Sequence, residues 1–297
     1  MRLLISRHLE NFLALYDARN MHAAADKKGI SQPALTKSLR LLEKDFGAEL
    51  FVRTPKGLEP TDAGDALYRH ARTIDQEARF ASMDIQDIHH NLGGRIRIGV
   101  GPILTLSIFP AVLVDFHQQF PFVEVTVETG VSSQLVQSLA RGNLDVVVTA
   151  LPEQPLPEGY VGLPLIKNDM TVICREDHPL RSRGEASLDE LSCFGLVGFT
   201  DDREFAKHSR RVFGSRAEKL QPVLQTTSLS VMFGILAATD YFAILSTMIL
   251  LRARREGLDR LPVQHDLWQI EIALMCKESL IGSRPISAIK EALLARV

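Results

Sequence analysis

Cysteine is scarce in this chain of 297 residues, and its placement excludes two kinds of site. The three cysteines, Cys174, Cys193 and Cys276, are widely spaced, without a CxxC pair or a Cys/His cluster. A disulfide framework needs paired cysteines, and a structural zinc site needs closely spaced ligands. We therefore expect reduced cysteines in the core and no metal site.

Long apolar runs are missing too, with one exception. Residues 231–251 contain a single charge, Asp240, and have about the length of a membrane span. A charge near the centre of a span costs roughly 2.5 to 3.5 kcal/mol, so we instead predict a buried helix over 229–238, a turn, and a buried strand over 242–245. Since no apolar leader is visible at the N-terminus, we expect a soluble, cytoplasmic protein.

Enzyme motifs are absent. The sequence has no G-x-S-x-G nucleophile elbow and no HExxH pair among its nine histidines. The loop GVGPIL, residues 99–104, lacks the third glycine of a dinucleotide-binding turn. We therefore predict that the protein is not an enzyme and needs no cofactor.

Net charge is only −2, which by itself argues against a nucleic-acid partner. The charges are unevenly distributed, however. Residues 19–56 hold eight Lys or Arg against four Asp or Glu, whereas residues 91–297 hold 21 against 23. The basic surface is local, and at about 100 to 200 residues per domain the length indicates two or more domains.

The basic segment contains a pattern of two short helices that meet at Gly29. Leucines at the i, i+4 and i+7 positions give the second helix a buried stripe. Its other faces offer amide, hydroxyl and cationic donors suited to base edges and phosphates in a major groove. On spacing alone, an ordinary solvated helix face is an equal alternative. The DNA-binding candidates, including an N-cap and a first-turn proline, are Ser31, Gln32, Pro33, Thr36, Lys37 and Arg40.

Flanking segments favour the DNA-reading interpretation. A preceding apolar helix and a thin alanine-rich helix let three helices share one core. Two short strands then follow, over 50–53 and 58–61, and their Pro/Gly turn presents Arg53 and Lys56 as a wing. Together, AAADKKGISQPALTKSLRLLEKDFGAELFVRTPKGLEPTDAG closely resembles the N-terminal signature of the LysR-type transcriptional regulators.

The sequence departs from that family at three places. Asn20, Met21 and His22 stand where a Gly-Ser-Phe-like turn is usual, and Lys28 replaces a packing leucine. The aliphatic stem of Lys28 could still cover apolar surface. In the C-terminal part of the chain, Thr-Asp-Tyr-Phe at 239–242 replaces a turn that is Gly-rich in the family. We therefore expect the geometry of this turn and the inducer preference to differ from those of the family.

A long helix is predicted after Thr61, an N-cap followed by two acids in the first turn. Its apolar residues alternate spacings of four and three over three heptads, which favours a coiled-coil contact between two copies; packing within one chain is the alternative. A dimer that binds two half-sites would follow. The seam consists of Leu67, Ala71, Ile74, Ala78, Ala81, Ile85 and Ile88.

Asn91 to Gly94 break this helix, and strand and helix patterns then alternate as β-α-β-α-β, which favours a parallel sheet with covering helices. Local similarities, IGVGP, FPFVEV, LDVVVTA and REDHPL, make this region resemble the effector-binding domain of the same family. Strands are expected over 95–100, 123–129, 144–149, 170–174, 194–199, 223–226, 242–245 and 270–275, and helices over 109–116, 134–140 and 286–295, with a capping box at Ser187 and Glu190.

The fold class that the resemblance implies has two parts. The first is an N-terminal all-α winged helix-turn-helix with a long linker helix, and the second a C-terminal α/β two-lobed domain like the periplasmic binding proteins. The expected boundaries are 1–61 for the DNA-binding domain, 62–92 for the dimerisation helix, and 93–297 for the effector domain, with lobes of about 93–163 plus 268–297 and 164–267, and crossings near 163–167 and 262–268.

Ligands of open α/β sheets bind beyond the carboxyl ends of strands, near helix N-termini. The loops at those positions are rich in hydroxyl groups and poor in Lys and Arg, so we expect a small anion or carboxylate. The family resemblance makes Thr149 and Thr200 the firmest choices, although for any single hydroxyl a plain N-cap is the alternative. The effector-binding candidates are Gly101, Pro102, Ile103, Thr105, Ser132, Ser133, Thr149, Phe199, Thr200 and Thr226.

The resemblance thus implies a LysR-type DNA-binding transcriptional regulator whose promoter binding is modulated by a small-molecule effector. Its expected partners are double-stranded promoter DNA and further copies of itself, as a homodimer or homotetramer; RNA polymerase is a candidate partner, and a membrane is not. A transport-type binding protein is one alternative, but it would not need the winged helix. A purely architectural DNA protein is another, but it would not need the effector-binding domain. A ligand-induced change in DNA binding would distinguish a regulator from an architectural protein.

Overall fold

The computed structural model describes residues 6–54, 57–87 and 94–296. Their contacts divide the chain into two compact units, one of residues up to Gly94 together with Arg141–Asn143, and one of the remaining residues. Two predicted site residues, Lys56 of the wing and Ile88 of the seam, lie outside the described residues.

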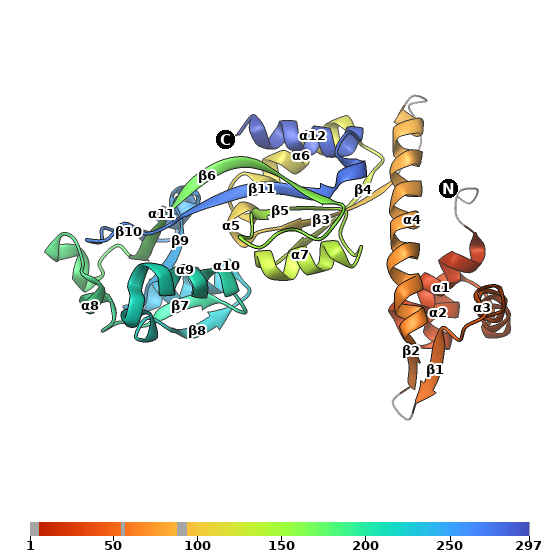
Figure 1. The fold of residues 1–297 in the computed structure, drawn as a ribbon. Helices are drawn as coiled ribbons and strands as arrows, with labels where there is room; N and C mark the ends of the chain where they lie inside the picture. The colour runs from red at the N-terminus through yellow and green to blue at the C-terminus, as the bar shows by residue number, and fades with distance from the viewer. Residues whose placement is uncertain (1–5, 55–56, 88–93, 297) are drawn as a thin grey trace. The chain divides into compact units, whose positions relative to one another are not determined.

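The N-terminal unit is a three-helix core with a hairpin (Figure 1). Phe12, Leu15 and Leu35 are buried at its centre, where the three helices meet. Gly29 and Gly47 end the second and third helices in the left-handed conformation, with φ of 64° and 65°. The predicted winged helix-turn-helix is confirmed. Its elements are α1 (Arg7–Ala18), α2 (Met21–Lys28), α3 (Gln32–Phe46), β1 (Phe51–Thr54) and β2 (Gly57–Pro60).

The residues that depart from the family pattern are accommodated locally. Asn20 is the N-cap of α2, and its side-chain oxygen accepts hydrogen bonds from the N–H groups of His22 and Ala23 at 2.9 and 3.0 Å. Lys28 turns its ammonium toward Glu10, at 2.8 Å. The Asn20 cap thus begins α2 in place of the family's usual turn, and the ion pair with Glu10 accommodates Lys28 in place of the usual leucine.

The linker helix α4 (Asp62–Asp87) begins as predicted, because the Thr61 hydroxyl accepts a hydrogen bond from the Gly64 N–H at 3.0 Å. The heptad seam changes role along it. Leu67 and Ala71 pack into the three-helix core of the same chain, so packing within one chain holds for this first part. Farther along, Ile74 and Ile85 are 46% and 57% exposed, whereas Ala78 between them is only 7% exposed and so is not free for a partner helix.

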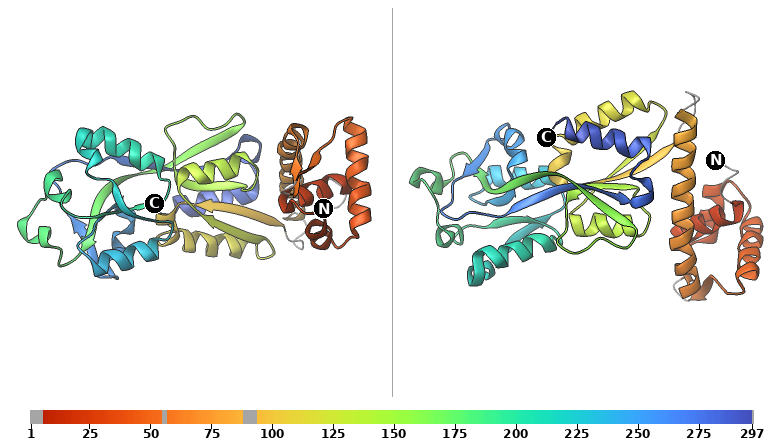
Figure 2. Two further views of the ribbon diagram at one scale, coloured as in Figure 1. Left: turned by 90° about the horizontal axis from the view of Figure 1, so that it is seen from below. Right: turned by 45° about the horizontal axis from the view of Figure 1, so that its top comes forward.

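The second unit contains two lobes that share long strands (Figures 1 and 2). In the first lobe the strand order is β4-β3-β5-β11-β6. β3 runs parallel to β4 and β5, as the alternating pattern predicts, whereas β11 is antiparallel to both its neighbours. Helices α6 and α12 cover one face of this sheet and α7 the other. The elements are β3 (Arg95–Val100), α5 (Pro102–Thr105), α6 (Phe109–Gln119), β4 (Glu124–Thr129), α7 (Ser132–Ala140), β5 (Val146–Ala150), β11 (Gln269–Lys277), η4 (Glu278–Leu280) and α12 (Arg284–Leu294).

The second lobe is built on the far half of β6 (Tyr160–Arg175), which pairs with β9 and β10, and on the parallel pair β7–β8. The capping box at Ser187 and Glu190 is confirmed. Strand β10 escaped sequence prediction. The elements are η1 (Pro179–Arg183), α8 (Leu188–Leu191), β7 (Leu196–Phe199), α9 (Arg203–Phe213), η2 (Gly214–Glu218), β8 (Pro222–Thr226), α10 (Leu229–Ala238), β9 (Ala243–Ser246), η3 (Thr247–Ile249), α11 (Leu250–Arg254) and β10 (Leu258–Leu261).

Strands β6 and β11 carry the chain between the lobes. β6 pairs with β11 up to Asp169 and with β9 from Met170, so the lobes meet at this point of the strand. The second crossing was predicted at 262–268, which ends one residue before β11 begins. Val263 forms a bridge with Ala186, and Trp268 packs on α9, both within the second lobe. The return to the first lobe begins at Gln269, where β11 starts.

The apolar segment 231–251 forms the end of α10, strand β9 and a short helix, with Met232 and Leu236 fully buried. No helix among the described residues is long and apolar enough to cross a membrane. Cys174 and Cys276 are buried in β6 and β11, but Cys193 is exposed because it follows the short surface helix α8; its predicted core position is wrong.

Candidate DNA interface and effector cleft

Helix α3 presents a donor-rich face. A hollow on its surface is lined by five of the predicted residues, Gln32, Pro33, Thr36, Lys37 and Arg40. Lys37 and Arg40 are exposed, and no described acidic side chain pairs with either. The Thr36 hydroxyl already donates to the Gln32 carbonyl at 3.0 Å, and Ser31 caps the helix by accepting from the Ala34 N–H. The amide and the two cations are therefore the groups most available to DNA.

The orientation of α3 is fixed by a polar cluster that sequence reasoning missed. The buried Ser38 hydroxyl accepts a hydrogen bond from the Asn11 amide at 3.0 Å and contacts the His8 ring nitrogen at 2.8 Å. Both partners come from α1. Neutral polar residues on the inner face of an otherwise apolar stripe were the only sequence indication of this cluster.

The wing places Arg53 on an exposed position of β1. The hairpin pairs Phe51 with Pro60 and Thr54 with Gly57, so the strands carry Arg53 beside the three-helix core. Arg53 is thus accessible, and its contact with DNA stays a prediction.

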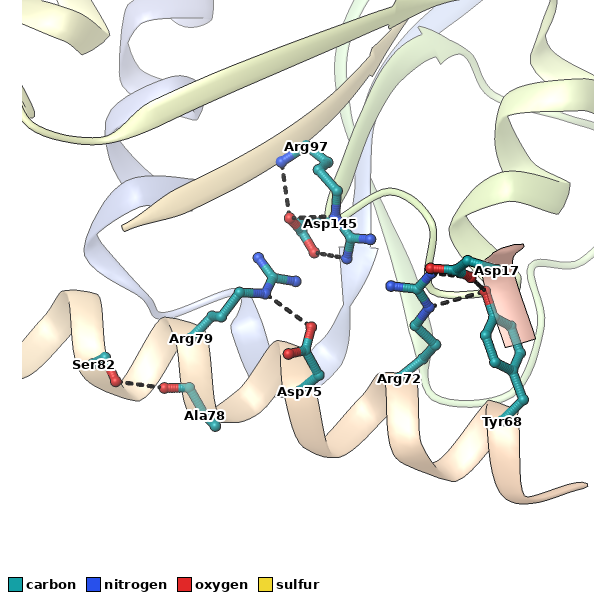
Figure 3. Close-up of polar contacts among 9 residues, drawn as sticks. All are labelled: Asp17, Tyr68, Arg72, Asp75, Ala78, Arg79, Ser82, Arg97 and Asp145. Carbon is teal, nitrogen blue, oxygen red and sulfur yellow. Dashed lines mark hydrogen bonds and ion pairs between the residues drawn. The ribbon is translucent and has the colours of Figure 1, made fainter. Parts of the chain in front are cut away.

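Helix α4 is joined to α1 by the polar network drawn in Figure 3. Arg72 binds Asp17, and the Tyr68 hydroxyl donates to the same carboxylate at 3.1 Å. Tyr68 also stacks on Tyr16, with ring centroids 3.7 Å apart. Burial raises the pKa of Tyr68, so the hydroxyl stays protonated and continues to donate. The first turns of the linker are thereby part of the DNA-binding unit.

In the second unit, a cleft of about 450 Å³ lies between the two lobes. Both crossing strands contribute to it, β6 through Met170 and β11 through Gln269 to Ile272. Six of the ten predicted effector residues line it, and these are Gly101, Pro102, Ile103, Ser132, Thr149 and Phe199.

Thr149 has the environment expected of a ligand-binding hydroxyl. The residue is only 4% exposed, and no described group makes a hydrogen bond with its hydroxyl. A Cβ atom at Gly101 would lie 2.7 Å from the Thr149 Oγ1, so glycine is required there for the loop to approach this side chain. Because Thr149 lines the cleft and its hydroxyl has no described partner, a ligand atom in the cleft is a fitting acceptor or donor for it.

The other four predicted residues do not line the cleft, because local hydrogen bonds hold them elsewhere. The Thr105 hydroxyl donates to the Pro102 carbonyl, and the Thr226 hydroxyl accepts from the Ser228 N–H. Ser133 donates to the Asp201 carbonyl at 3.4 Å, and so contacts the other lobe instead of the cleft. Thr200 donates its backbone N–H to Thr226 beside the β7–β8 pair.

Helix α9 supplies much of the cleft wall, although none of its residues was a predicted effector-binding residue. Phe205 and His208 face the cleft and contact Trp268, the single tryptophan of the chain, with the His208 ring stacked on the indole at a centroid distance of 5.4 Å. The aromatic side chains three residues apart on a charged helix were the available sequence indication. Asp202 caps α9 by accepting from the Phe205 N–H at 3.0 Å, and burial raises the pKa of Asp202.

Charge in the cleft is concentrated at one place. Glu153, in the loop after β5, meets Lys207 at 2.9 Å, His208 at 3.8 Å and Arg211 at 4.0 Å. Lys207 above all lowers the pKa of Glu153. The loops after the strands were predicted to be poor in Lys and Arg, and the cationic side chain of the cleft wall, Arg211, comes instead from helix α9. Within the described ranges, no three His, Cys, Asp or Glu side chains come together as metal ligands would.

Comparison with known families agrees with this geometry. The family model described as "LysR substrate binding domain" matches residues 89–297, and that described as "Bacterial regulatory helix-turn-helix protein, lysR family" matches residues 6–65. The chain belongs to the LysR family.

Among other LysR-family proteins, the chain is 30% identical over 278 residues to the HTH-type transcriptional regulator GalR of Pseudomonas putida, covering 87% of this chain and 65% of that protein. It therefore spans less than two thirds of that relative. It is 27% identical over 257 residues to the DNA-binding transcriptional dual regulator OxyR of Escherichia coli K12, covering 86% and 84% of the two chains. The crystal structure of ArgP from Mycobacterium tuberculosis has the same fold, with a TM-score of 0.73 at 20% identity, covering 99% of this chain and 97% of that one.

Proposed function

We propose that this LysR-family protein is a cytoplasmic transcriptional regulator that binds double-stranded promoter DNA and changes its binding when a small effector enters the cleft between its lobes. The observation that carries the proposal is the presence in one chain of two features: a cationic face on α3 that no described acid pairs, and a cleft between two lobes that Thr149 lines. We infer no catalytic activity and no cofactor, with RNA polymerase a candidate partner on the promoter.

The DNA-reading role rests on α3 and the wing. Gln32, Lys37 and Arg40 offer the amide and cationic donors that recognise base edges and phosphates. The Ser38 cluster holds the opposite face of the helix against α1. A recognition helix must be both exposed and rigidly held, and α3 meets both conditions.

Dimerisation through α4 rests on Ile74, Ala81 and Ile85, the exposed members of the seam. These apolar side chains lie on one face of the helix and outside the core of their own chain. A second copy that covers them removes apolar surface from water, which stabilises a dimer. A dimer, or a tetramer of two such dimers, would then engage a site with two half-sites.

Relatives named for hydrogen peroxide suggest a second candidate, a thiol sensor of peroxide. The cysteines of this chain argue against it. Burial raises the pKa of Cys174 to about 12 and that of Cys276 to about 11, which suppresses the thiolate that peroxide oxidises. Cys193 is exposed, donates to the Asp189 carbonyl, and is not among the residues that line the cleft. We therefore favour an effector that binds reversibly in the cleft over oxidation of a cysteine by peroxide.

The test is a footprint on the DNA beside the protein's own gene. We expect protection of an interrupted palindrome, and a changed footprint with one metabolite of the pathway that the neighbouring operon encodes. Binding that is no tighter than to random DNA, or a footprint that no such metabolite alters, would refute the regulator or its effector dependence, respectively.

A further inference from the structure

An ion-pair cluster bridges the two lobes at the cleft. Glu153 belongs to the first lobe, and its three partners, Lys207, His208 and Arg211, belong to α9 of the second. Glu153, His208 and Arg211 all line the cleft, and His208 is stacked on Trp268. The Glu153 carboxylate therefore occupies an anion-binding position that opens directly onto the ligand space.

The cations of the cluster have few other partners. Lys207 also meets Glu204, but at 3.9 Å, and no other described acid pairs with Arg211. The other acidic residues of the wall are Asp202 and Glu204, at the start of α9, and Glu271 of β11. Among the described residues of the cleft wall, the Lys or Arg side chain that can attract an acidic ligand is Arg211 of α9.

The Glu153 pairs are easily exchanged. The Glu153 side chain is 45% exposed and that of Lys207 44%. Exposed pairs of this kind contribute little to stability, because water solvates both partners nearly as well. A carboxylate brought by a ligand can take the same charge-assisted hydrogen bonds while Glu153 turns to solvent.

We propose that Lys207, His208 and Arg211 form the acid-binding site of the effector cleft, and that Glu153 is its internal competitor. The proposal rests on the proposed function and names its effector class: a carboxylic acid with an apolar body, which packs against Trp268 and Phe205. When such an acid displaces Glu153, the ion pairs between the lobes are lost. The exchange thus links acid binding to the contact between lobes.

The test uses the full-length protein and two probes of equal shape, cyclohexanecarboxylate and its uncharged amide. Neither has a ring that absorbs with tryptophan, so the emission of Trp268 reports binding beside His208 while calorimetry gives the Kd. We expect Glu153→Gln to bind the acid about ten-fold more tightly than the wild type, because the competitor is removed. The control Glu158→Gln, at an exposed acid of the same loop, should bind like the wild type.

Two further results complete the test. The gain should disappear in Glu153→Gln/Arg211→Gln, and the amide should bind all variants equally. Equal Kd values of the acid for Glu153→Gln and wild type, a gain that the amide shares, or no acid binding by Glu153→Gln would overturn the proposal. Since no DNA is involved, a failure here with an intact operator footprint removes the acid site alone and leaves the regulator standing.

Discussion

Arg72 donates hydrogen bonds from Nη2 to both carboxylate oxygens of Asp17, at 2.7 and 2.8 Å. This pair ties the linker helix α4 to α1 of the DNA-binding unit (Figure 3). The Arg72 Nε also donates to the Tyr68 hydroxyl at 2.9 Å, which in turn donates to Asp17. The three side chains form a closed ring of hydrogen bonds. This ring holds the start of α4 rigidly against α1 of the DNA-binding unit.

Arg72→Gln should therefore destabilise the DNA-binding unit. Its guanidinium is mostly buried, and the loss of hydrogen bonds to a charged partner costs about 1.5 to 3 kcal/mol. Urea unfolding followed by circular dichroism would measure this loss. Arg69→Gln, which removes an exposed arginine one turn earlier, is the control; equal effects of the two substitutions would show that the Asp17 pair has no special role.

Arg40→Ala and Lys37→Ala should weaken operator binding. Each lost phosphate contact should reduce the slope of log affinity against log salt by about 0.9, and a lost base contact should cost roughly 1 to 3 kcal/mol and relax specificity. Fluorescence anisotropy across a salt series measures both. Lys44→Ala, in the last turn of the same helix, controls for general charge. Unchanged affinity in both test variants would rule out α3 as the reader.

Ile74→Asp should separate the two copies of the linker helix. At a seam covered by a partner, the new carboxylate would be buried without a counter-charge, at a cost of several kcal/mol. The chain itself should still fold, because Ile74 is 46% exposed within it. Sedimentation should show loss of the linker-mediated dimer, and operator affinity should fall because the half-sites bind independently.

The matched control for the seam is His70→Asp, an exposed position off the heptad pattern of the same helix. It should keep the wild-type oligomer and the wild-type affinity. If Ile74→Asp behaves like this control, the exposed isoleucines do not form the dimer contact.

Thr149→Val should weaken effector binding while leaving DNA affinity without effector nearly intact. Removal of a hydroxyl that bonds a ligand costs about 0.5 to 1.5 kcal/mol, and more if the ligand group is charged. Calorimetry with the metabolite that alters the operator footprint is the measurement. Thr200→Val is now the control, because Thr200 does not line the cleft; a loss confined to Thr200→Val would place the ligand elsewhere.

Only one of the three cysteines should react with a thiol reagent in the native protein. With pKa values raised by burial to about 12 and about 11, Cys174 and Cys276 remain protonated at pH 8, and neither is accessible. Ellman's reagent should therefore modify one thiol per chain, and none in Cys193→Ser. Fast modification of two or more thiols would contradict the burial of β6 and β11.

Local features of this protein were determined by the sequence alone. The cap at Ser31, the break at Gly29, the capping box at Ser187 and helix α10 all depend on side chains within four residues of one another. A helix cap and an apolar stripe depend on residues of one helix and its flanks, so they can be recognised without knowing the tertiary structure. The DNA-reading half was predictable for this reason.

The tertiary structure alone decided which residues share the cleft. Glu153 and Lys207 are far apart in sequence and meet only because β5 and α9 face each other across two lobes. Thr149 is the last residue but one of β5 and Thr200 directly follows β7, yet one lines the cleft and the backbone of the other pairs with Thr226. No periodicity encodes that difference, because it depends on how two lobes dock through crossing strands. The seam shows the same limit, since its spacing is regular while only the three-helix core decides that Ala71 is covered and Ile74 is not.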